Sequence, residues 1–172
     1  MKVVSAIIKS IDKLNEWVAR VASFAMYFLV LTLVYEVVAR YLFKSPTLWS
    51  YDMTYMLSSI FLMFGLAYTF KMRGHVSVDL IAERLPRRAA ALLACVMALV
   101  LFFPFLYLLM KVMIPNLRMS WAFKEKAAAG TWLPPIYPFK AWVFMGLFLL
   151  MLQGVSEFIK DLTVLVTGGE RP

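Results

Sequence analysis

Residues 40–86 read RYLFKSPTLWSYDMTYMLSSIFLMFGLAYTFKMRGHVSVDLIAERLP, and this stretch decides how the rest of the chain is interpreted. A short polar and aromatic segment leads into a run without a charge from Met53 to Phe70, and a basic turn follows at 73–79. An apolar run of this length with aromatic and basic flanks is typical of a helix that crosses a membrane. The stretch therefore predicts one span with a different polar segment on each side.

The composition of the whole chain indicates a membrane protein. Of its 172 residues, 63% are hydrophobic and only 16% are charged, whereas soluble domains carry about 45–50% apolar and about 25% charged residues. A soluble fold would have to expose large apolar patches, which soluble monomers avoid. The net charge of +8 is spread between the apolar runs, which favours a topological role over a nucleic-acid-binding face.

One cysteine, Cys95, and one histidine, His75, limit the chemistry of the chain. They exclude an internal disulfide, a cysteine-based metal cluster and a haem held by two histidines of this chain. The sequence also shows no Ser-His-Asp arrangement, metal-ligand spacing or phosphate loop. We therefore expect neither catalysis nor a cofactor.

We predict an all-α integral membrane fold in one membrane domain covering residues 1–172. A bilayer core about 30 Å thick needs about 20 apolar residues in a helix. Four segments meet this requirement or nearly so, at about 17–39, 53–70, 89–110 and 138–159. Pro104 should bend the third span, and Gly65, Gly146 and Gly154 are positions where helices can approach closely.

The distribution of lysine and arginine predicts that both termini are cytoplasmic. Basic residues are more numerous in the segments that this orientation places inside than in the two outer loops, although the loop after the third span weakens the bias. Two further segments are predicted to be amphipathic helices at the membrane surface, namely residues 2–16 and 77–85. The alternative for both segments is a simple extension of the neighbouring spans.

Glu36 is the deepest acidic residue that the sequence places in a span, about one turn from the outer end of the first span. Arg40 follows at i+4 on the same face, in the favourable order for a helical ion pair. The pair has two interpretations: a proton or cation site, or an interfacial ion pair that anchors the helix or binds a partner. We favour the ion pair.

Trp49 and Asp52 open the second span, where aromatic residues and an acid in the first helical turn are locally favourable. The alternative is an outer docking surface in which Asp52 pairs with a basic residue of a partner. Arg73, His75 and Asp79 follow the second span at the inner surface, where cations meet anionic lipids. A pH-sensing role for His75 is the less favoured interpretation of that residue.

The stretch at 40–86 resembles the small membrane subunit of tripartite ATP-independent periplasmic (TRAP) transporters, the DctQ-like family. The resemblance covers roughly residues 15–162 and is most specific in this stretch. It rests on these residues: Arg40-Tyr41-x-Phe43, Trp49-x-x-Asp52, Gly65, Arg73-Gly74-His75-Val76-x-Val78-Asp79 and Leu85-Pro86. Many relatives have an acidic pair after the tryptophan, where this chain has Tyr51-Asp52.

This resemblance implies a four-helix subunit of the bacterial inner membrane that works without catalysing a reaction. Its implied partners are a large permease subunit, which holds the substrate and cation sites, and a soluble periplasmic binding protein that delivers an organic acid. The small subunit is expected to scaffold the large one and to help receive the binding protein. Glu36, Arg40, Trp49 and Asp52 would form the outer docking region, and Arg73, His75 and Asp79 the cytoplasmic turn.

Two alternative functions remain open from the sequence. Small proton-coupled drug antiporters also have four short spans with an acid in the first, but they place that glutamate near the bilayer centre, and Glu36 lies near a helix end. A membrane assembly factor with no transport role is the other alternative.

Overall fold

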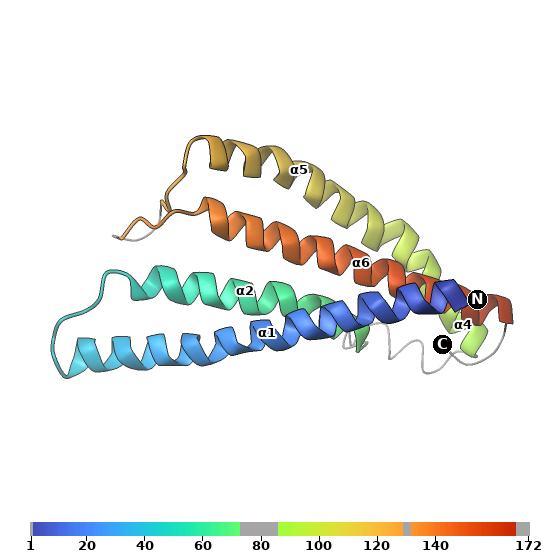
Figure 1. The fold of residues 1–172 in the computed structure, drawn as a ribbon, viewed down its shortest axis with the longest axis horizontal. Helices are drawn as coiled ribbons and strands as arrows, with labels where there is room; N and C mark the ends of the chain where they lie inside the picture. The colour runs from blue at the N-terminus through green and yellow to red at the C-terminus, as the bar shows by residue number, and fades with distance from the viewer. Residues whose placement is uncertain (1, 73–85, 129–131, 168–172) are drawn as a thin grey trace.

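The computed structural model of the chain describes residues 2–72, 86–128 and 132–167 (Figure 1). Within these ranges, four helices are long and apolar enough to cross a membrane, as predicted. The third of them is continuous but consists of three labelled parts. The elements are α1 (Lys2–Tyr41), α2 (Ser50–Lys71), α4 (Arg87–Met97), the π-helical turn η1 (Ala98–Phe102), α5 (Phe103–Ala122) and α6 (Tyr137–Thr167).

The helices form because a backbone in lipid must satisfy its own hydrogen bonds, and a helix does so within one segment. The shortest of the four membrane-crossing helices, α2, has 22 residues and is about 33 Å long at 1.5 Å per residue, close to the bilayer core thickness of about 30 Å. Each expected span lies inside one of the long helices. The first, third and fourth helices extend well past the expected boundaries.

The helix α1 continues without a break from Lys2 to Tyr41. Residues 2–16 are therefore continuous with the first spanning helix in this structure, as the extension alternative expects, and their position at the membrane surface stays a prediction. The other segment predicted to lie at the surface, 77–85, falls outside the described residues.

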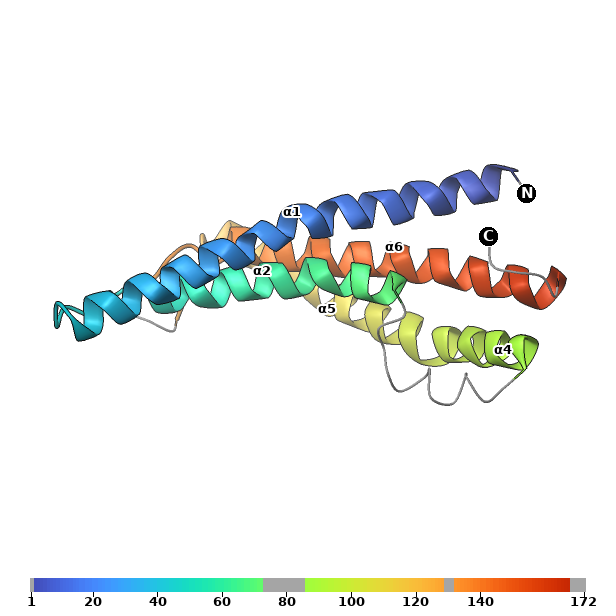
Figure 2. The ribbon, with the colours of Figure 1, turned by 90° about the horizontal axis from the view of Figure 1, so that it is seen from below.

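The helices form an open layer in the order α1, α2, α6, α5, and not a closed bundle (Figure 1). The central helix α6 packs against α1, α2, α4 and α5. Among the described residues, no backbone contact joins α5 to α1 or α2. The layer twists along its length, so that α1, α6 and α4 are spread apart in Figure 2 at the end where α1 begins.

The two ends of the layer differ in what they contain. The start of α1 and the end of α6 lie together at one end, which we call the termini end (Figure 1). Residues 42–49, between α1 and α2, and residues 123–128 and 132–136, between α5 and α6, lie at the opposite end, which we call the loop end. The expectation that both termini face the same side of a membrane fits this arrangement.

The buried apolar core is small and lies where α1, α2 and α6 meet. Its buried members are Ala22, Phe64, Ala67 and Leu149. The ring of Phe64 packs edge-on against Trp142 of α6 with 6.0 Å between ring centroids. Most other large apolar side chains are exposed, as expected of a chain whose surroundings are lipid or another membrane subunit.

Two glycines allow close packing on α6. A Cβ atom at Gly146 would lie 2.9 Å from Cβ of Met63 on α2, and one at Gly154 would lie 2.1 Å from the ring of Phe102 in η1. The sequence expectation of close helix approach is confirmed at these two positions. At Gly65 a Cβ atom would meet nothing within 4 Å, so that glycine serves no close contact among the described residues.

The π-helical turn explains the direction change in the third span. The amide of Phe103 donates to the carbonyl of Ala98, five residues earlier, immediately before Pro104. Proline lacks an amide hydrogen, and its ring clashes with the carbonyl four residues back, so regular α-helical bonding cannot continue through it. The bend predicted at Pro104 is thus accommodated by one wide turn between α4 and α5 (Figure 1).

Candidate functional site

Glu36 is a buried carboxylate that joins the end of α1 to the following loop. Its Oε1 accepts hydrogen bonds from Arg40 Nε at 3.0 Å and Arg40 Nη2 at 2.6 Å. Its Oε2 accepts from the backbone amide of Thr47 at 3.1 Å and also from the Thr47 hydroxyl. Both carboxylate oxygens are engaged by the chain itself. The geometry is that of an anchoring ion pair, the interpretation favoured from sequence.

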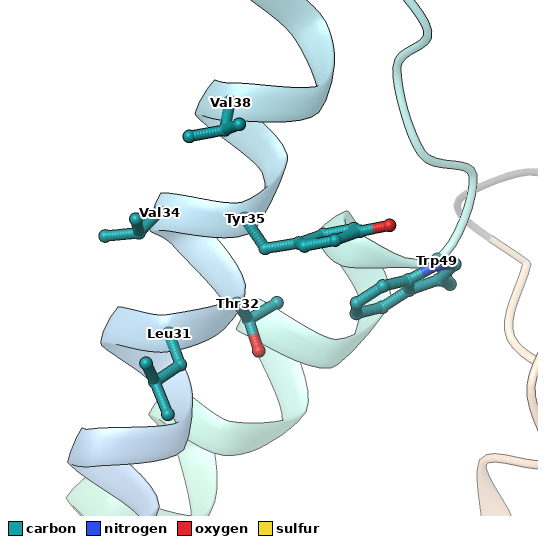
Figure 3. Close-up of a pocket in the computed structure, with 6 residues that line it drawn as sticks. All are labelled: Leu31, Thr32, Val34, Tyr35, Val38 and Trp49. Carbon is teal, nitrogen blue, oxygen red and sulfur yellow. The ribbon is translucent and has the colours of Figure 1, made fainter. Parts of the chain in front are cut away.

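Beside this ion pair, Trp49 stacks on Tyr35, with ring centroids 5.7 Å apart and an interplanar angle of 27°. The two rings form one wall of a shallow, open groove of about 530 Å³ on the outer surface of α1 (Figure 3). Apart from Trp49, its lining comes from α1: Leu31, Thr32, Val34, Tyr35 and Val38. The Thr32 hydroxyl donates a hydrogen bond to the carbonyl of Phe28 in the preceding turn. The groove therefore offers mainly apolar surface.

Asp52 lies in the first turn of α2 and is only 4% exposed. Its Oδ2 has no hydrogen-bond partner among the described residues. An acid in the first turn is stabilised by the free amides and the dipole of the helix N-terminus. The carboxylate is enclosed by the chain itself, and it is not presented on the outer surface to a partner.

The described parts of the connection between α5 and α6, residues 123–128 and 132–136, are joined by backbone hydrogen bonds. Ala127 N donates to Pro134 O at 2.8 Å, and Ile136 N donates to Glu125 O at 3.0 Å. The side chain of Lys140, in the first turn of α6, donates to Glu125 Oε2 at 2.6 Å. This ammonium holds the pKa of Glu125 below its usual value of 4.5.

At the termini end, a set of buried polar side chains joins α1 to α6, and we call it the α1–α6 polar cluster. Lys160 Nζ donates to Asp12 Oδ2 at 2.7 Å and to Glu157 Oε1 at 2.6 Å. Gln153 Nε2 donates to Asp12 Oδ1 at 2.8 Å and to Glu157 Oε1 at 3.2 Å. The cluster consists of Asp12, Asn15, Gln153, Ser156, Glu157 and Lys160.

The remaining bonds of the cluster extend it along both helices. Asn15 Nδ2 donates to Gln153 Oε1 at 2.7 Å, and the Ser156 hydroxyl donates to Asp12 Oδ1 at 3.0 Å. Gln153 and Ser156 are completely buried. Because the partners on the two helices are more than 130 residues apart in sequence, the cluster fixes the position of α1 on α6.

A second ionic contact joins α1 to α2 near this cluster. Glu16 Oε2 accepts from Lys71 Nζ at 3.1 Å, and Glu16 Oε1 accepts from Arg20 Nη2 at 3.0 Å. The termini end is therefore held by polar contacts from α1 to both of its neighbours.

The α1–α6 polar cluster was not predicted from the sequence. Glu157, Lys160 and Asp161 are buried in α6. The expected fourth span ended at residue 159, so Glu157 lies close to its expected end and Lys160 just beyond it. The available signal was the spacing of Gln153, Glu157 and Lys160 at i, i+4 and i+7, which places all three on one helical face.

The structure brings the four outer candidates to the loop end but gives them different roles. Glu36 and Arg40 bind each other, Trp49 borders the groove, and Asp52 is enclosed. Their assignment to a partner interface stays a prediction. Arg73, His75 and Asp79 lie outside the described residues. In the described ranges, no group of three or more His, Cys, Asp or Glu residues is placed to hold a metal ion.

Comparison with known proteins identifies the family. A search of curated protein sequences finds no match. The family model for tripartite ATP-independent periplasmic transporters, DctQ component, matches residues 29–164. This match covers most of the chain, includes the stretch at 40–86, and agrees with the four membrane-crossing helices. The chain therefore belongs to the DctQ component family of the tripartite ATP-independent periplasmic transporters.

Proposed function

We propose that this DctQ-family protein is the non-catalytic small permease subunit that scaffolds the large permease subunit of its transporter. We further propose that its loop end helps to receive the soluble periplasmic binding protein during cation-coupled uptake of an organic acid. Family membership supports a role as a membrane component of such a transporter. The scaffold role, the docking role and the type of solute are our inferences.

The open layer is the observation that carries the scaffold proposal. Membrane helices associate through shape and polar contacts, since lipid is as apolar as the helix surfaces. Here α5 packs on α6 alone among the other spanning helices, and α1 has its neighbours on one side. A layer of this kind has wide apolar faces that another helical subunit can cover. Most of the polar side chains described at the loop end and the termini end bind other residues of the same chain.

For the docking role, the loop end supplies the candidate surface. Arg40 has a side chain that is 57% exposed although it is bound to Glu36, and the ring of Trp49 borders the open groove. We propose that these two side chains contact a partner, while Glu36 and Asp52 hold the loop and the start of α2 in shape. The proposed location is the bacterial inner membrane, with the termini end in the cytoplasm, which is supported by the distribution of basic residues.

The experiment is expression of the affinity-tagged full chain with and without the large permease subunit of the same transporter. We expect the two to co-purify in mild detergent. Uptake in vesicles should require both of them together with the binding protein, and omission of this chain should abolish it. If the chain never co-purifies with the large subunit and uptake proceeds without it, the scaffold proposal is wrong. Proton-driven export by the purified chain alone would instead identify a small antiporter.

A further inference from the structure

The first part of α1 has two different polar faces. Asp12 and Asn15 point at α6 and are held by Lys160 and Gln153. Ile8, one turn before Asp12, is 4% exposed. These contacts fix the rotation of the helix about its own axis. The side chains on the other faces of this segment therefore have a fixed orientation relative to α6.

A basic stripe lies beside the fixed face. Lys9, Lys13 and Arg20 are exposed and fall within an arc of about 40° at 100° per residue. Lys9 and Lys13 form no ion pair within the described residues, and Arg20 remains 73% exposed while it binds Glu16. Two like charges at i and i+4 repel each other. This arrangement is stabilised when an external anion lies against both lysines.

The position of the stripe along α1 matches the headgroup layer. Trp17, which is largely exposed, marks the expected start of the first span, as belt tryptophans do. Lys13 lies about 6 Å and Lys9 about 12 Å beyond it at 1.5 Å per residue. The headgroup layer is about 5–8 Å thick on each side of the bilayer. A lysine side chain at either position is long enough to reach this layer with its ammonium group.

We propose that Lys9, Lys13 and Arg20 form a binding surface for anionic phospholipid headgroups, held in direction by the α1–α6 polar cluster. The inference goes beyond the scaffold and docking roles and does not depend on them, because it concerns the chain and its lipid alone. The ligand chemistry is a phosphodiester with net negative charge, as in phosphatidylglycerol. Basic residues near a membrane surface each add about a fivefold factor to the affinity for anionic lipid.

The experiment compares full-length protein in nanodiscs of phosphatidylcholine alone and in nanodiscs containing increasing phosphatidylglycerol. The midpoint of thermal unfolding is measured for the parent, for the double variant K9Q/K13Q, and for the charge-preserving control K9R/K13R. We expect phosphatidylglycerol to raise the midpoint of the parent and of K9R/K13R. The increase should be largely lost in K9Q/K13Q and should decrease with added salt.

Phosphatidylcholine nanodiscs separate lipid binding from folding. There, K9Q/K13Q should unfold at the same temperature as the parent, since the exchanged side chains are exposed and form no ion pair with the described residues. The proposal is overturned if phosphatidylglycerol raises the midpoint of K9Q/K13Q as much as that of the parent, or raises neither. A second result would also overturn it. If K9Q/K13Q responds to phosphatidylglycerol as the parent does but no longer co-purifies with the large subunit, the stripe is a protein interface.

Discussion

At the scale of single residues, the buried or paired acids of the loop end serve the chain itself. The Glu36 carboxylate accepts a hydrogen bond from the Thr47 amide, and the Glu125 carboxylate accepts one from the Lys140 ammonium. The i, i+4 spacing of Glu36 and Arg40 predicted their ion pair from sequence, because that spacing alone brings two helical side chains together. The contact to Thr47 was not predictable in the same way, since it depends on the path of the loop between α1 and α2.

Glu125 gives a prediction of pH dependence. Its pKa is lowered in the folded protein by Lys140, so the unfolded chain binds a proton more readily. The pair therefore stabilises the loop fully above the usual pKa of 4.5, and this contribution is lost as the pH falls through the lowered folded pKa. The effect should be small because the pair is exposed.

Hydrogen exchange of the Ala127 and Ile136 amides, which bond within this loop, is the measurement. We expect their protection to decrease between neutral pH and about pH 3.5, after correction for intrinsic exchange. In Glu125→Gln the protection should start lower and depend less on pH, and Lys140→Met should behave in the same way. Equal pH dependence in the parent and both variants would show that the ion pair does not hold the loop.

At the scale of the elements, length and apolar composition were sufficient to predict the spanning helices, because lipid permits few other structures. The bend at Pro104 was also predictable, since proline cannot take part in regular helical bonding. The helix ends were not. Lys111 and Arg118 lie within α5, although the charge pattern had assigned both to a loop, because charged residues can continue a helix beyond the lipid.

The contact of α6 with the π-helical turn leads to a prediction about Gly154. An alanine there would place its Cβ 2.1 Å from the Phe102 ring, so Gly154→Ala should destabilise the protein by about 1–3 kcal/mol through overpacking. Gly65→Ala is the matched control because Gly65 is also in a helix but has open space around it. The control should be neutral or stabilising by up to about 1 kcal/mol.

Thermal unfolding in detergent measures both variants. Adding Phe102→Leu to Gly154→Ala should restore part of the lost stability, because the smaller side chain makes room for the new methyl group. If Gly154→Ala and Gly65→Ala unfold at the same temperature, the close approach of α6 and η1 is not important for stability.

At the scale of the whole molecule, the layer depends on contacts that a single sequence does not reveal. An apolar face is the same whether it meets lipid, another helix of the chain or another subunit, so the order α1, α2, α6, α5 could not be predicted. The α1–α6 polar cluster is the clearest example. Asp12 and Lys160 were visible as charges, but nothing in their spacing indicated that they meet, with 147 residues between them.

The α1–α6 polar cluster should therefore determine whether the first part of α1 stays on α6. Lys160→Met removes the ammonium that the half-buried Asp12 and the buried Glu157 share, which should cost about 3–5 kcal/mol because carboxylates with little access to water lose a charge that balances them. The same segment is amphipathic enough to lie on the membrane surface, so we expect it to detach from α6 while the spanning helices remain folded. The triple variant D12N/E157Q/K160M removes the two carboxylates together with the ammonium and should keep the segment docked.

Detachment of the first part of α1 from α6 is measurable with the substitution Ile8→Cys in a Cys95→Ala background. In the parent this position is buried and should react slowly with a water-soluble maleimide. Its rate should increase strongly in Lys160→Met and return near the parent rate in the triple variant. A slow rate in Lys160→Met would mean that apolar packing alone holds the segment. A fast rate in the triple variant would mean that the charges themselves, and not merely their balance, attach α1 to α6.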